Sequence, residues 1–536
     1  MAEPFASPAD PGGKRQPLET PGGGASPQVI VIGAGPVGLS AALLLARWGI
    51  RVLVLDQRPE RGRGGSKSIC QQRDVLDIWY AAGAGRIAKE GLAWTTARTY
   101  YRGRELFSWS FEGEGPLPAC VNISQTRTEQ ILDAAVAAQP LVEVRWNHEV
   151  TGITQDAGGV TVHCGARLLR ASYVLACAGA RAQRVREALG VTFDGQTYDD
   201  RFLICDIRAD LPGRENERHF HFDPVWNPGR QVLIHPCPGG TFRIDWQIAP
   251  DFIPADADRA RAIRKVVGDR PYELLSHSTY RFHSRIASRM RVGRVLLVGD
   301  CAHLVAPFGA RGLNSGVPDA ENAAWKLAFV LNGWAGEGLL ETYHIERHAA
   351  ALENLEVTAA TMRFIAPRTV EERMRRRTAL EGGRIAEIDS GRFAEPFWYV
   401  DSPLTTPDPA RPFSGRPPRG SPCVPAPGVI LPDVALPEGR LREFCRDGFL
   451  VLLGEMCDSR LFVQVMGKVI KAPLAVRGFA EMDGTGSLAG KLGAGPDEAW
   501  LIRPDSHIAA IIPHAGPESV AVAMSRALGD FPTFDP

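Results

Sequence analysis

Three glycines, Gly33, Gly35 and Gly38, form a G-x-G-x-x-G pattern directly after a β-branched apolar run. In such a pattern the first glycine permits a tight turn, the second lets a pyrophosphate approach the backbone, and the third lets a helix pack close to the preceding strand. The helix N-terminus offers unpaired N–H groups and the positive end of its dipole to phosphate. About 20 residues later, Asp56 is placed to accept hydrogen bonds from ribose hydroxyls. These residues predict a dinucleotide site, with a glycine-rich turn that binds nothing as the alternative.

The residues around these glycines read as a strand, a turn, a helix and a second strand. Residues 29–32 are Val-Ile-Val-Ile, residues 39–48 have helical character, and residues 51–55 form another apolar run. This order is the start of a doubly wound α/β sheet. The uncharged stretch 29–46 has 18 residues, the minimum for a membrane span. Its strand-like start and its Gly-Ala-Gly-Pro turn argue against a transmembrane helix, and the motif alone does not separate FAD from NAD.

A second motif occupies residues 293–303, which read Gly-Arg-Val-Leu-Leu-Val-Gly-Asp-Cys-Ala-His, and continues from 307 as Pro-Phe-Gly-Ala-Arg-Gly-Leu-Asn. It resembles the flavin-binding signature of the FAD-dependent aromatic hydroxylases, the single-component group A flavoprotein monooxygenases of the p-hydroxybenzoate and phenol hydroxylase type. The resemblance spans residues 28–365 and is closest to the 3-(3-hydroxyphenyl)propionate hydroxylase-like branch. Gln125-Thr-Arg127, expected before a helix, and residues 340–347 reinforce it.

The resemblance implies FAD as the cofactor and NADPH or NADH as the co-substrate. Asp300, after the apolar run 295–298, is suited to accept hydrogen bonds from the ribityl hydroxyls of the flavin. Gly312, Leu313 and Asn314 open a helix whose N–H groups can face the negative charge of the reduced ring. The family proline that matches Pro307 lines the face of the ring that reacts with oxygen. The expected cofactor contacts are Gly33, Gly35, Pro36, Val37, Gly38, Asp56, Gln57, Arg58, Gln125, Arg127, Asp300, Pro307, Gly312, Leu313 and Asn314.

Each of these assignments has a plainer alternative. Asp300 can be a helix N-cap and Gly312 an ordinary turn glycine, while Gln125 and Arg127 can be surface residues. Two positions also depart from the family pattern. Ala178 stands where the family usually has an aspartate that touches both FAD and the incoming nicotinamide, which bears on the rate of reduction and on the choice between NADPH and NADH. Arg311 replaces a neutral residue and would bring a cation near the flavin, to hold the reduced anion or an acidic substrate.

Short mixed runs between residues 200 and 250 suggest an antiparallel sheet inserted into the nucleotide-binding body. The resemblance implies a phenolic substrate, which attacks the oxygen bound to the flavin more readily once it has lost its proton. A base that accepts this proton is therefore expected in the sheet. If these runs are strands, His219 and His221 share one face, as do Arg243 and Asp245, so each pair points into the pocket together or away from it together. The expected catalytic residues are His235, Arg243, Pro307 and Arg311, and no metal ligand is predicted.

Composition divides the chain further. Residues 1–27, rich in Pro, Gly, Ala and Ser, are predicted to be a disordered tail. We expect a Rossmann-type FAD-binding domain in two parts, 28–190 and 286–400, the second with helices, around an antiparallel substrate-binding sheet at 191–285. Prolines recur through 401–428, which predicts a linker. Residues 429–536 resemble the thioredoxin-like C-terminal domain of phenol hydroxylases, which likewise lacks redox cysteines, most clearly at 500–505.

Charge and cysteine content exclude several other classes. The 536 residues leave room for about three domains. Lys+Arg and Asp+Glu are equal at 61 each, so there is no basic excess of the kind that nucleic-acid binders carry. The ten cysteines include no C-x-x-C pair, which disfavours a disulfide framework, a zinc ribbon and a thiol redox centre. The tail lacks the order of a targeting peptide, and a cytoplasmic protein is expected.

The resemblance implies an aromatic hydroxylation cycle. NAD(P)H reduces FAD, O2 adds to give a C4a-hydroperoxyflavin, and one oxygen passes to a phenolic ring while the other leaves as water. The expected partners are a small aromatic substrate and O2, without nucleic acid or membrane, and with a homodimer left open. One alternative is a flavoenzyme of other outcome, by halogenation or oxidation, although 246–250 does not match the Trp-x-Trp-x-Ile-Pro motif of halogenases. The other is a non-catalytic flavin-binding protein, suggested by Ala178.

Overall fold

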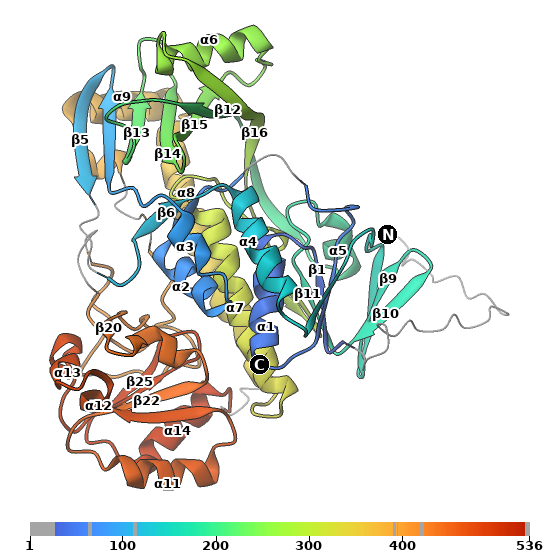
Figure 1. Ribbon diagram of the computed structural model, residues 1–536, viewed down its shortest axis with the longest axis vertical. Coiled ribbons are helices and arrows are strands. Elements are labelled where there is room, and N and C mark those ends of the chain that lie inside the picture. The colour runs from blue at the N-terminus through green and yellow to red at the C-terminus, as the bar shows by residue number, and fades with distance from the viewer. Residues whose placement is uncertain are drawn as a thin grey trace.

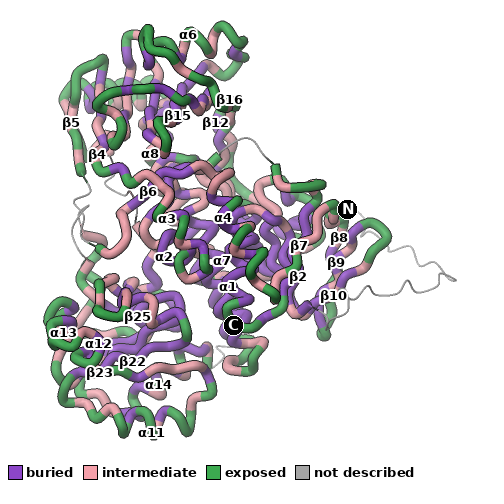
Figure 2. The backbone as a smooth tube through the Cα atoms, viewed as in Figure 1, coloured by how far each residue is buried: buried purple, intermediate pink, exposed green. Residues whose placement is uncertain are grey.

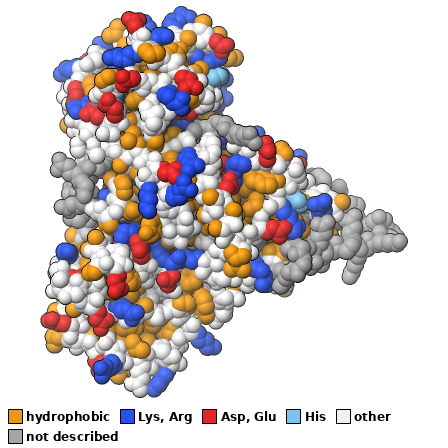
Figure 3. All heavy atoms as spheres, in the orientation of Figure 1, with side chains coloured by type: hydrophobic (Ala, Val, Ile, Leu, Met, Phe, Trp, Pro, Cys, Tyr) orange, Lys and Arg blue, Asp and Glu red, His pale blue; other side chains and the backbone are white. Residues whose placement is uncertain are grey.

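The computed structural model describes residues 27–62, 67–110, 115–389, 393, 395–417 and 423–530. Of the predicted tail, only residue 27 is among them, and residues 418–422 of the predicted linker also lie outside. The described chain has three parts, with a central α/β domain between a large sheet and a C-terminal domain (Figure 1). Acidic and basic side chains are interspersed over the face shown in Figure 3.

The central domain is built on a six-stranded sheet. Its strands are β1 (Val29–Ile32), β2 (Val52–Leu55), β7 (Val142–Arg145), β11 (Tyr173–Ala176), β17 (Arg291–Val292) and β18 (Val295–Leu297), of which β1, β2, β11 and β18 are short apolar runs. Their order is β17-β18-β11-β1-β2-β7, and neighbours are parallel except β17 with β18. Complete burial of β1, β2, β11 and β18 is typical of strands covered on both faces (Figure 2). The predicted α/β fold class is confirmed.

Helices and a small sheet supply the two covers. On one face α1 (Pro36–Arg47) packs against α4 (Gln125–Ala137) and α7 (Arg311–Leu331). A three-stranded antiparallel sheet lies on the other side, made of β8 (Gly152–Asp156), β9 (Gly159–Cys164) and β10 (Arg167–Ala171) (Figure 1). The remaining elements of this domain are α2 (Arg73–Ala81), α3 (Arg86–Glu90), α5 (Gln183–Ala188), and the paired β3 (Cys70–Gln72) and β6 (Cys120–Asn122).

The large sheet has eight strands in the order β19-β16-β12-β15-β14-β13-β4-β5. They are β4 (Thr96–Tyr101), β5 (Arg104–Ser110), β12 (Phe193–Ala209), β13 (Glu217–Phe222), β14 (Gln231–Cys237), β15 (Thr241–Ile248), β16 (Tyr272–Ala287) and β19 (His303–Leu304). The sheet is thus not confined to residues 191–285. β4 and β5 join it from the segment predicted to be purely nucleotide-binding, because β4 pairs in parallel with β13. One face is covered by α6 (Asp256–Val267) and the other by α8 (Gly338–Ile365) and α9 (Val370–Gly382), which α10 (Ile385–Ile388) follows.

The C-terminal domain has a four-stranded sheet in the order β23-β22-β24-β25. β22 (Phe449–Leu453) is parallel to β23 (Leu474–Gly478) and antiparallel to β24 (Ala499–Ile502), which is antiparallel to β25 (Ile508–Ile512). Its helices are α11 (Ser459–Val469), α12 (Phe479–Asp483), α13 (Ser487–Leu492) and α14 (Pro517–Ala527), and β20 (Ala435–Leu436) and β21 (Gly439–Arg440) form a small hairpin. The described part of the predicted linker packs on this domain, since Thr405 is buried and the Thr406 N–H donates to the Ala509 carbonyl at 2.8 Å.

Candidate flavin and substrate site

The glycine turn after β1 has no room for side chains at its first and third glycines. Gly33 has a φ of +110°, and a Cβ there would lie 2.4 Å from the Cys177 carbonyl oxygen. A Cβ on Gly38 would lie 1.9 Å from the Gly33 carbonyl oxygen, so the helix could not pack as it does. A Cβ on Gly35 would meet no protein atom within 4 Å. The fold therefore requires the outer two glycines, while the middle one faces open space at the start of α1.

The start of α1 is open to an anion. Gly35 is the N-cap residue and has no side chain to cap the helix, and the first turn contains no acidic residue. Pro36, at the first helical position, has no N–H to satisfy. The N–H groups that follow, beginning with Val37, and the positive end of the helix dipole therefore have no acceptor from a capping side chain, as a phosphate site requires.

Asp56 lies directly beneath this turn, at the end of β2. It accepts a hydrogen bond from the Ala34 N–H at 2.8 Å and two from the Arg58 guanidinium at 2.8 and 2.9 Å. Burial raises the pKa of Asp56, but the bonds from Arg58 and Ala34 outweigh it and the pKa is lowered. Asp56 is thus a carboxylate that holds the turn closed. Its predicted contact with a ribose stays a prediction, and the neighbouring Gln57 is exposed.

The two sequence motifs meet at Val37. A Cβ on Gly299 would lie 3.3 Å from the Val37 methyl groups, and one on Gly316 of α7 would lie 2.8 Å from the same side chain. The next residue, Asp300, is in a single 3₁₀ turn that begins at Gly299 and whose N-cap residue is Val298, so Asp300 is not the N-cap. Asp300 is solvent-exposed, yet the surrounding chain desolvates it and raises its pKa. An exposed but desolvated carboxylate beside the glycine turn is suited to accept from a cofactor hydroxyl.

The start of α7 is held by Asn314. Its side-chain oxygen accepts from the Gln72 N–H at 2.9 Å, and its nitrogen donates to the carbonyls of Cys70 and Ala310 at 2.9 and 2.6 Å. Ala310 sits in the left-handed region, with a φ of 57°. The Asn314 side chain therefore positions the turn, while the half-buried Gly312 and Leu313 present backbone at the helix start.

Arg311 points away from this helix start. Its buried guanidinium donates to Asn354 Oδ1 of α8 at 2.6 Å. It lines a cavity of about 60 Å³ between α7, α8 and the C-terminal domain. Its predicted action on the flavin therefore stays a prediction, and the contact seen is with α8. Pro307 is exposed in the segment before α7, and the adjacent Phe308 packs edge-on against Phe202 and Phe282 at 5.7 Å.

The face of the large sheet turned towards α8 is aromatic. Tyr101, Tyr198, Phe202, Phe222 and Phe282 form one cluster with Leu233, Ala306, Phe308 and residues of α8. Register places His235 directly across from Arg243, which is across from Asp206. Because side chains alternate along a strand, His235, Arg243 and Asp245 share the face of Leu233 and Phe202, whereas His219 and His221 lie on the opposite face. The preferred pair is thus on the side of the flavin motifs.

His235 and Arg243 differ in their hydrogen-bond and ion-pair partners. His235 Nε2 lies 3.6 Å from Asp245 Oδ2, and burial lowers the pKa of His235. Asp245 Oδ1 is buried without a hydrogen-bond partner among the described residues. Arg243 is buried, makes two bonds to Asp206 at 2.8 and 3.0 Å, and donates to the Lys67 carbonyl at 2.9 Å. Arg243 therefore anchors the segment that leads into β3.

Gln125 and Arg127 lie in the first turn of α4 rather than before it, because Ser124 is the N-cap and its hydroxyl accepts from the Arg127 N–H at 3.1 Å. Gln125 accepts from the Ser68 N–H at 3.1 Å. Arg127 pairs with Glu90 of α3 at 2.7 Å. Ala178 is half-buried, and its Cα lies 3.3 Å from the position of a Gly33 Cβ, so it adjoins the glycine turn.

Sequence reasoning missed Asp319, a fully buried carboxylate on α7. It accepts from the Gly299 N–H at 3.0 Å, from His303 Nε2 at 2.7 Å and from Arg347 Nε at 2.6 Å. Burial raises the pKa of Asp319, but His303 and Arg347 lower it to about 2. Asp319 thus fixes the backbone that presents Asp300. Its sequence signal was its place in the stretch that continues the second motif beyond Asn314.

A second buried ionic cluster joins this region to the C-terminal domain. Glu346 of α8 accepts from Lys326 at 2.6 Å, from Ser402 at 2.6 Å and from both terminal nitrogens of Arg503 at 2.6 and 3.0 Å. Burial raises the pKa of Glu346, but Arg503 and Lys326 outweigh it and the pKa is lowered. Arg503 also pairs with Asp505 at 2.6 Å. The central and C-terminal domains therefore meet at a buried ion cluster, and separating them would leave buried charges unpaired.

The profile of the FAD binding domain family matches residues 26–358, more than half of the chain. The chain belongs to the FAD-binding domain family. Its glycine turn, its open helix start and Asp300 are thus a fitting FAD site. Among the described residues no group of three or more His, Cys, Asp or Glu side chains is arranged to hold a metal, and none of the helices searched is long and apolar enough to cross a membrane.

Relatives within this family are named as hydroxylases and monooxygenases. A 3-(3-hydroxy-phenyl)propionate/3-hydroxycinnamic acid hydroxylase from Mycobacterium sp. (strain JLS) is 31% identical over 354 residues, which cover 63% of this chain and 60% of the relative. The match thus spans less than two thirds of that relative's length. A rifampicin monooxygenase from Streptomyces venezuelae is 33% identical over 366 residues, covering 65% of this chain and 74% of the relative.

Solved structures share the fold over nearly the whole chain. The flavin-dependent monooxygenase PieE, in complex with FAD and substrate, aligns with a TM-score of 0.82 at 24% identity, covering 94% of this chain and 99% of that one. Aklavinone-11 hydroxylase, in a ternary complex with FAD and aklavinone, aligns with a TM-score of 0.76 at 25% identity and the same coverage. The similarity includes the C-terminal domain, because 94% of 536 residues extends beyond the family match.

Proposed function

We propose that this protein is an FAD-dependent monooxygenase that hydroxylates a phenolic substrate with NAD(P)H and O2. The observation that carries the proposal is the aromatic face of the large sheet, which includes Phe202, Phe222 and Phe282 and packs against Phe308, directly after Pro307. An aromatic ring held there lies between the sheet and the helix start at Gly312. Relatives named as aromatic hydroxylases support this reading.

Bound FAD would supply a hydride acceptor for NAD(P)H and the means to transfer one atom of O2 to an activated ring. In the balanced reaction a phenol, NAD(P)H, a proton and O2 give the hydroxylated phenol, NAD(P)⁺ and water. The turn at Gly35 and the start of α1 would hold the pyrophosphate. Asp300 would hold the ribityl chain, and the start of α7 would stabilise negative charge on the ring.

His235 is the proposed acceptor of the phenolic proton. Its lowered pKa keeps the imidazole neutral at pH 7, so it has a lone pair to accept with. Asp245, 3.6 Å from Nε2, would stabilise the imidazolium that forms. Arg243 is a positioning residue in this scheme, because its bonds to Asp206 and to the Lys67 carbonyl hold the chain around the site.

Turnover with isotopically labelled O2 tests the proposal. The purified protein is expected to carry FAD, to oxidise NAD(P)H and take up O2 only with a phenol present, and to place one labelled oxygen in the product. Replacing the proposed base, His235→Asn, should retain FAD but lower kcat by about 10²–10⁴. The control His163→Asn, on β9 with its ring bonded to Thr154, should not. Bound FAD without NAD(P)H oxidation across a phenol panel would overturn the proposal.

Ala178 favours a second candidate, a flavin-binding protein without turnover. The two candidates differ in one measurement, because only the monooxygenase has its flavin reduced by NAD(P)H in single-turnover mixing. We further propose a nucleotide-binding body in two parts around the large sheet, which β4 and β5 also join. We propose a thioredoxin-like assignment for the C-terminal domain on the basis of its mixed four-stranded sheet, and a cytoplasmic protein. A homodimer is an open possibility that analytical ultracentrifugation decides.

A further inference from the structure

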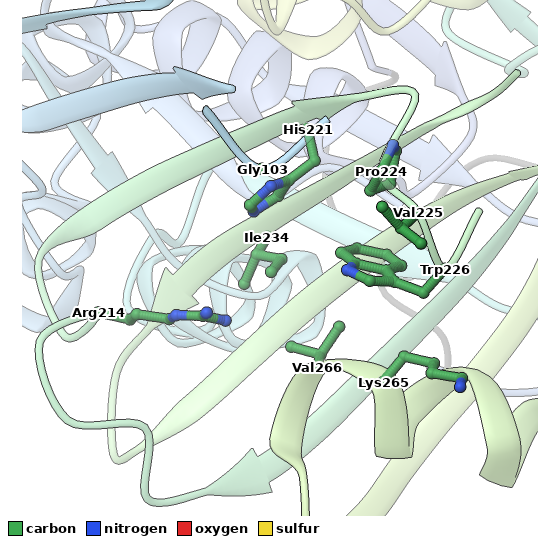
Figure 4. A pocket seen from close by; sticks show the side chains of 9 residues that line it. All are labelled: Gly103, Arg214, His221, Pro224, Val225, Trp226, Ile234, Lys265 and Val266. Atoms are coloured by element: carbon green, nitrogen blue, oxygen red, sulfur yellow. The ribbon is translucent and has the colours of Figure 1, made fainter. Parts of the chain in front are cut away.

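A cavity of about 170 Å³ lies on the face of the large sheet turned towards α6 (Figure 4). It is not part of the flavin and substrate site. Side chains alternate along β13 and β14, so His221 and Ile234 point into this cavity while Phe222 and Leu233 point to the aromatic cluster on the other face. Its walls are Gly103, Arg214, His221, Pro224, Val225, Trp226, Ile234, Lys265 and Val266.

Arg214 is a cation without a counter-ion. Two arginines beside β13 are paired, Arg98 with Glu217 at 2.6 Å and Arg102 with Asp223 at 2.9 Å. The half-buried Arg214 side chain makes no hydrogen bond or ion pair with any residue that the structure describes, and no acidic side chain lines the cavity. Burial and repulsion by Arg270 lower the pKa of Arg214. A guanidinium that has lost water and gained no partner is costly, and an anion would relieve that cost.

His221 is a second polar side chain that lines the same cavity. Its ring stacks on Tyr100, with centroids 4.7 Å apart and planes at 12°. Its Nε2 is buried and has no hydrogen-bond partner among the described residues. Burial, with repulsion from His219 and Arg214, lowers the pKa of His221 to about 3, so the ring is neutral at pH 7. A neutral imidazole can donate one hydrogen bond to an anion without adding charge.

Apart from Lys265 at its edge, the rest of the cavity wall is apolar. Figure 4 shows the Trp226 indole opposite Arg214, with Ile234 and Val266 between them and Lys265 extending away at the edge. Trp226 packs edge-on against Trp246, with the ring centroids 5.1 Å apart. A dry apolar cavity of about 150 Å³ accepts a benzene ring, so this one has room for a single ring with a small substituent. Apolar walls with one guanidinium match an aromatic ring that carries one carboxylate.

We propose that this cavity is a second small-molecule site, which binds a single-ring aromatic carboxylate with its carboxylate on Arg214 and His221 and its ring against Trp226. The bound acid lies one sheet thickness from the aromatic face, in contact with strands that also line that face. This site stands independently of the proposed hydroxylation, because binding needs neither NAD(P)H nor turnover.

Fluorine NMR titration of the FAD-bound protein with 4-fluorobenzoate tests the proposal. Saturable binding below about 10 mM is expected, with no change in the flavin absorption spectrum, and 4-fluorobenzamide should bind about tenfold more weakly because it lacks the charge. Arg214→Met should weaken 4-fluorobenzoate binding by about tenfold or more, and so should Val266→Phe, which fills the cavity without changing charge. Arg208→Met removes an exposed, surface-paired cation elsewhere in the sheet and should leave binding unchanged.

The outcomes separate this site from the one beside the flavin. Binding that perturbs the flavin spectrum and is weakened by His235→Asn but not by Arg214→Met places the acid at the flavin site and overturns the proposal. Wild-type affinity in both cavity variants also overturns it, as does the lack of saturable binding below about 10 mM. If Arg214→Met does not fold, Val266→Phe alone decides, since it keeps every charged group.

Discussion

Replacing Gly35 with alanine should separate cofactor binding from folding. The backbone of Gly35 has a φ of −77° and a ψ of 178°, which alanine adopts without strain, and the added Cβ meets no protein atom within 4 Å. Loss of chain entropy in the unfolded state favours the variant by about 0.4–1 kcal/mol. Alanine is the poorer N-cap by about the same amount. The two contributions offset, so the flavin-free protein should unfold at nearly the wild-type urea concentration.

FAD binding should respond differently. The methyl group occupies the space into which a pyrophosphate would come, and such overpacking costs about 1–3 kcal/mol, or roughly five- to 150-fold in Kd. Quenching of FAD fluorescence on titration with flavin-free protein measures that change. Gly38→Ala is the matched control, because its Cβ would lie 1.9 Å from the Gly33 carbonyl oxygen and should destabilise the fold itself. An unchanged FAD affinity for Gly35→Ala, or a large loss of flavin-free stability, would refute this account of the turn.

Three further predictions concern the surrounding charges. Asp300→Asn should raise the Kd for FAD by about tenfold or more, because hydrogen bonds to charged groups contribute about 1.5–3 kcal/mol. Unchanged flavin occupancy after gel filtration would contradict the proposed contact of Asp300 with the ribityl chain. Glu346→Gln leaves Lys326 and Arg503 short of a buried counter-ion and should lower the free energy of unfolding by about 3–5 kcal/mol in urea at pH 7. Because the pKa of Glu346 is lowered by folding, this stabilisation is full above the unfolded pKa of about 4.3 and is lost as pH falls below it towards the folded value. If the stability of Glu346→Gln falls with acid as steeply as that of the wild type, Glu346 does not stabilise the fold in this way. Ala178→Asp should speed flavin reduction by NAD(P)H in stopped-flow mixing, and an unchanged or slower rate shows that the missing carboxylate is compensated elsewhere.

Local patterns predicted the elements that bury continuous apolar runs. Residues 29–32 and 51–55 were expected to be strands and are β1, with the same bounds, and β2, which begins at Val52. A helix start was expected at Gly312, and α7 begins one residue earlier, at Arg311, and runs through Pro318. A proline inside a helix normally ends it. Here the buried bonds of Asn314 and Arg347 hold the first turns in place.

What the sequence alone determined was local: the glycine spacing that makes the turn at Gly35 and the alternation that places His219 with His221, and Arg243 with Asp245, on shared strand faces. Steric limits and a two-residue period act over a few positions, so they can be read without a fold. Only the tertiary structure decided that β4 pairs with β13, that Arg311 points to α8, and that Glu346 and Arg503 share one buried cluster. These contacts join residues more than 40 positions apart, and they form because burial leaves charged and backbone polar groups no water to bind.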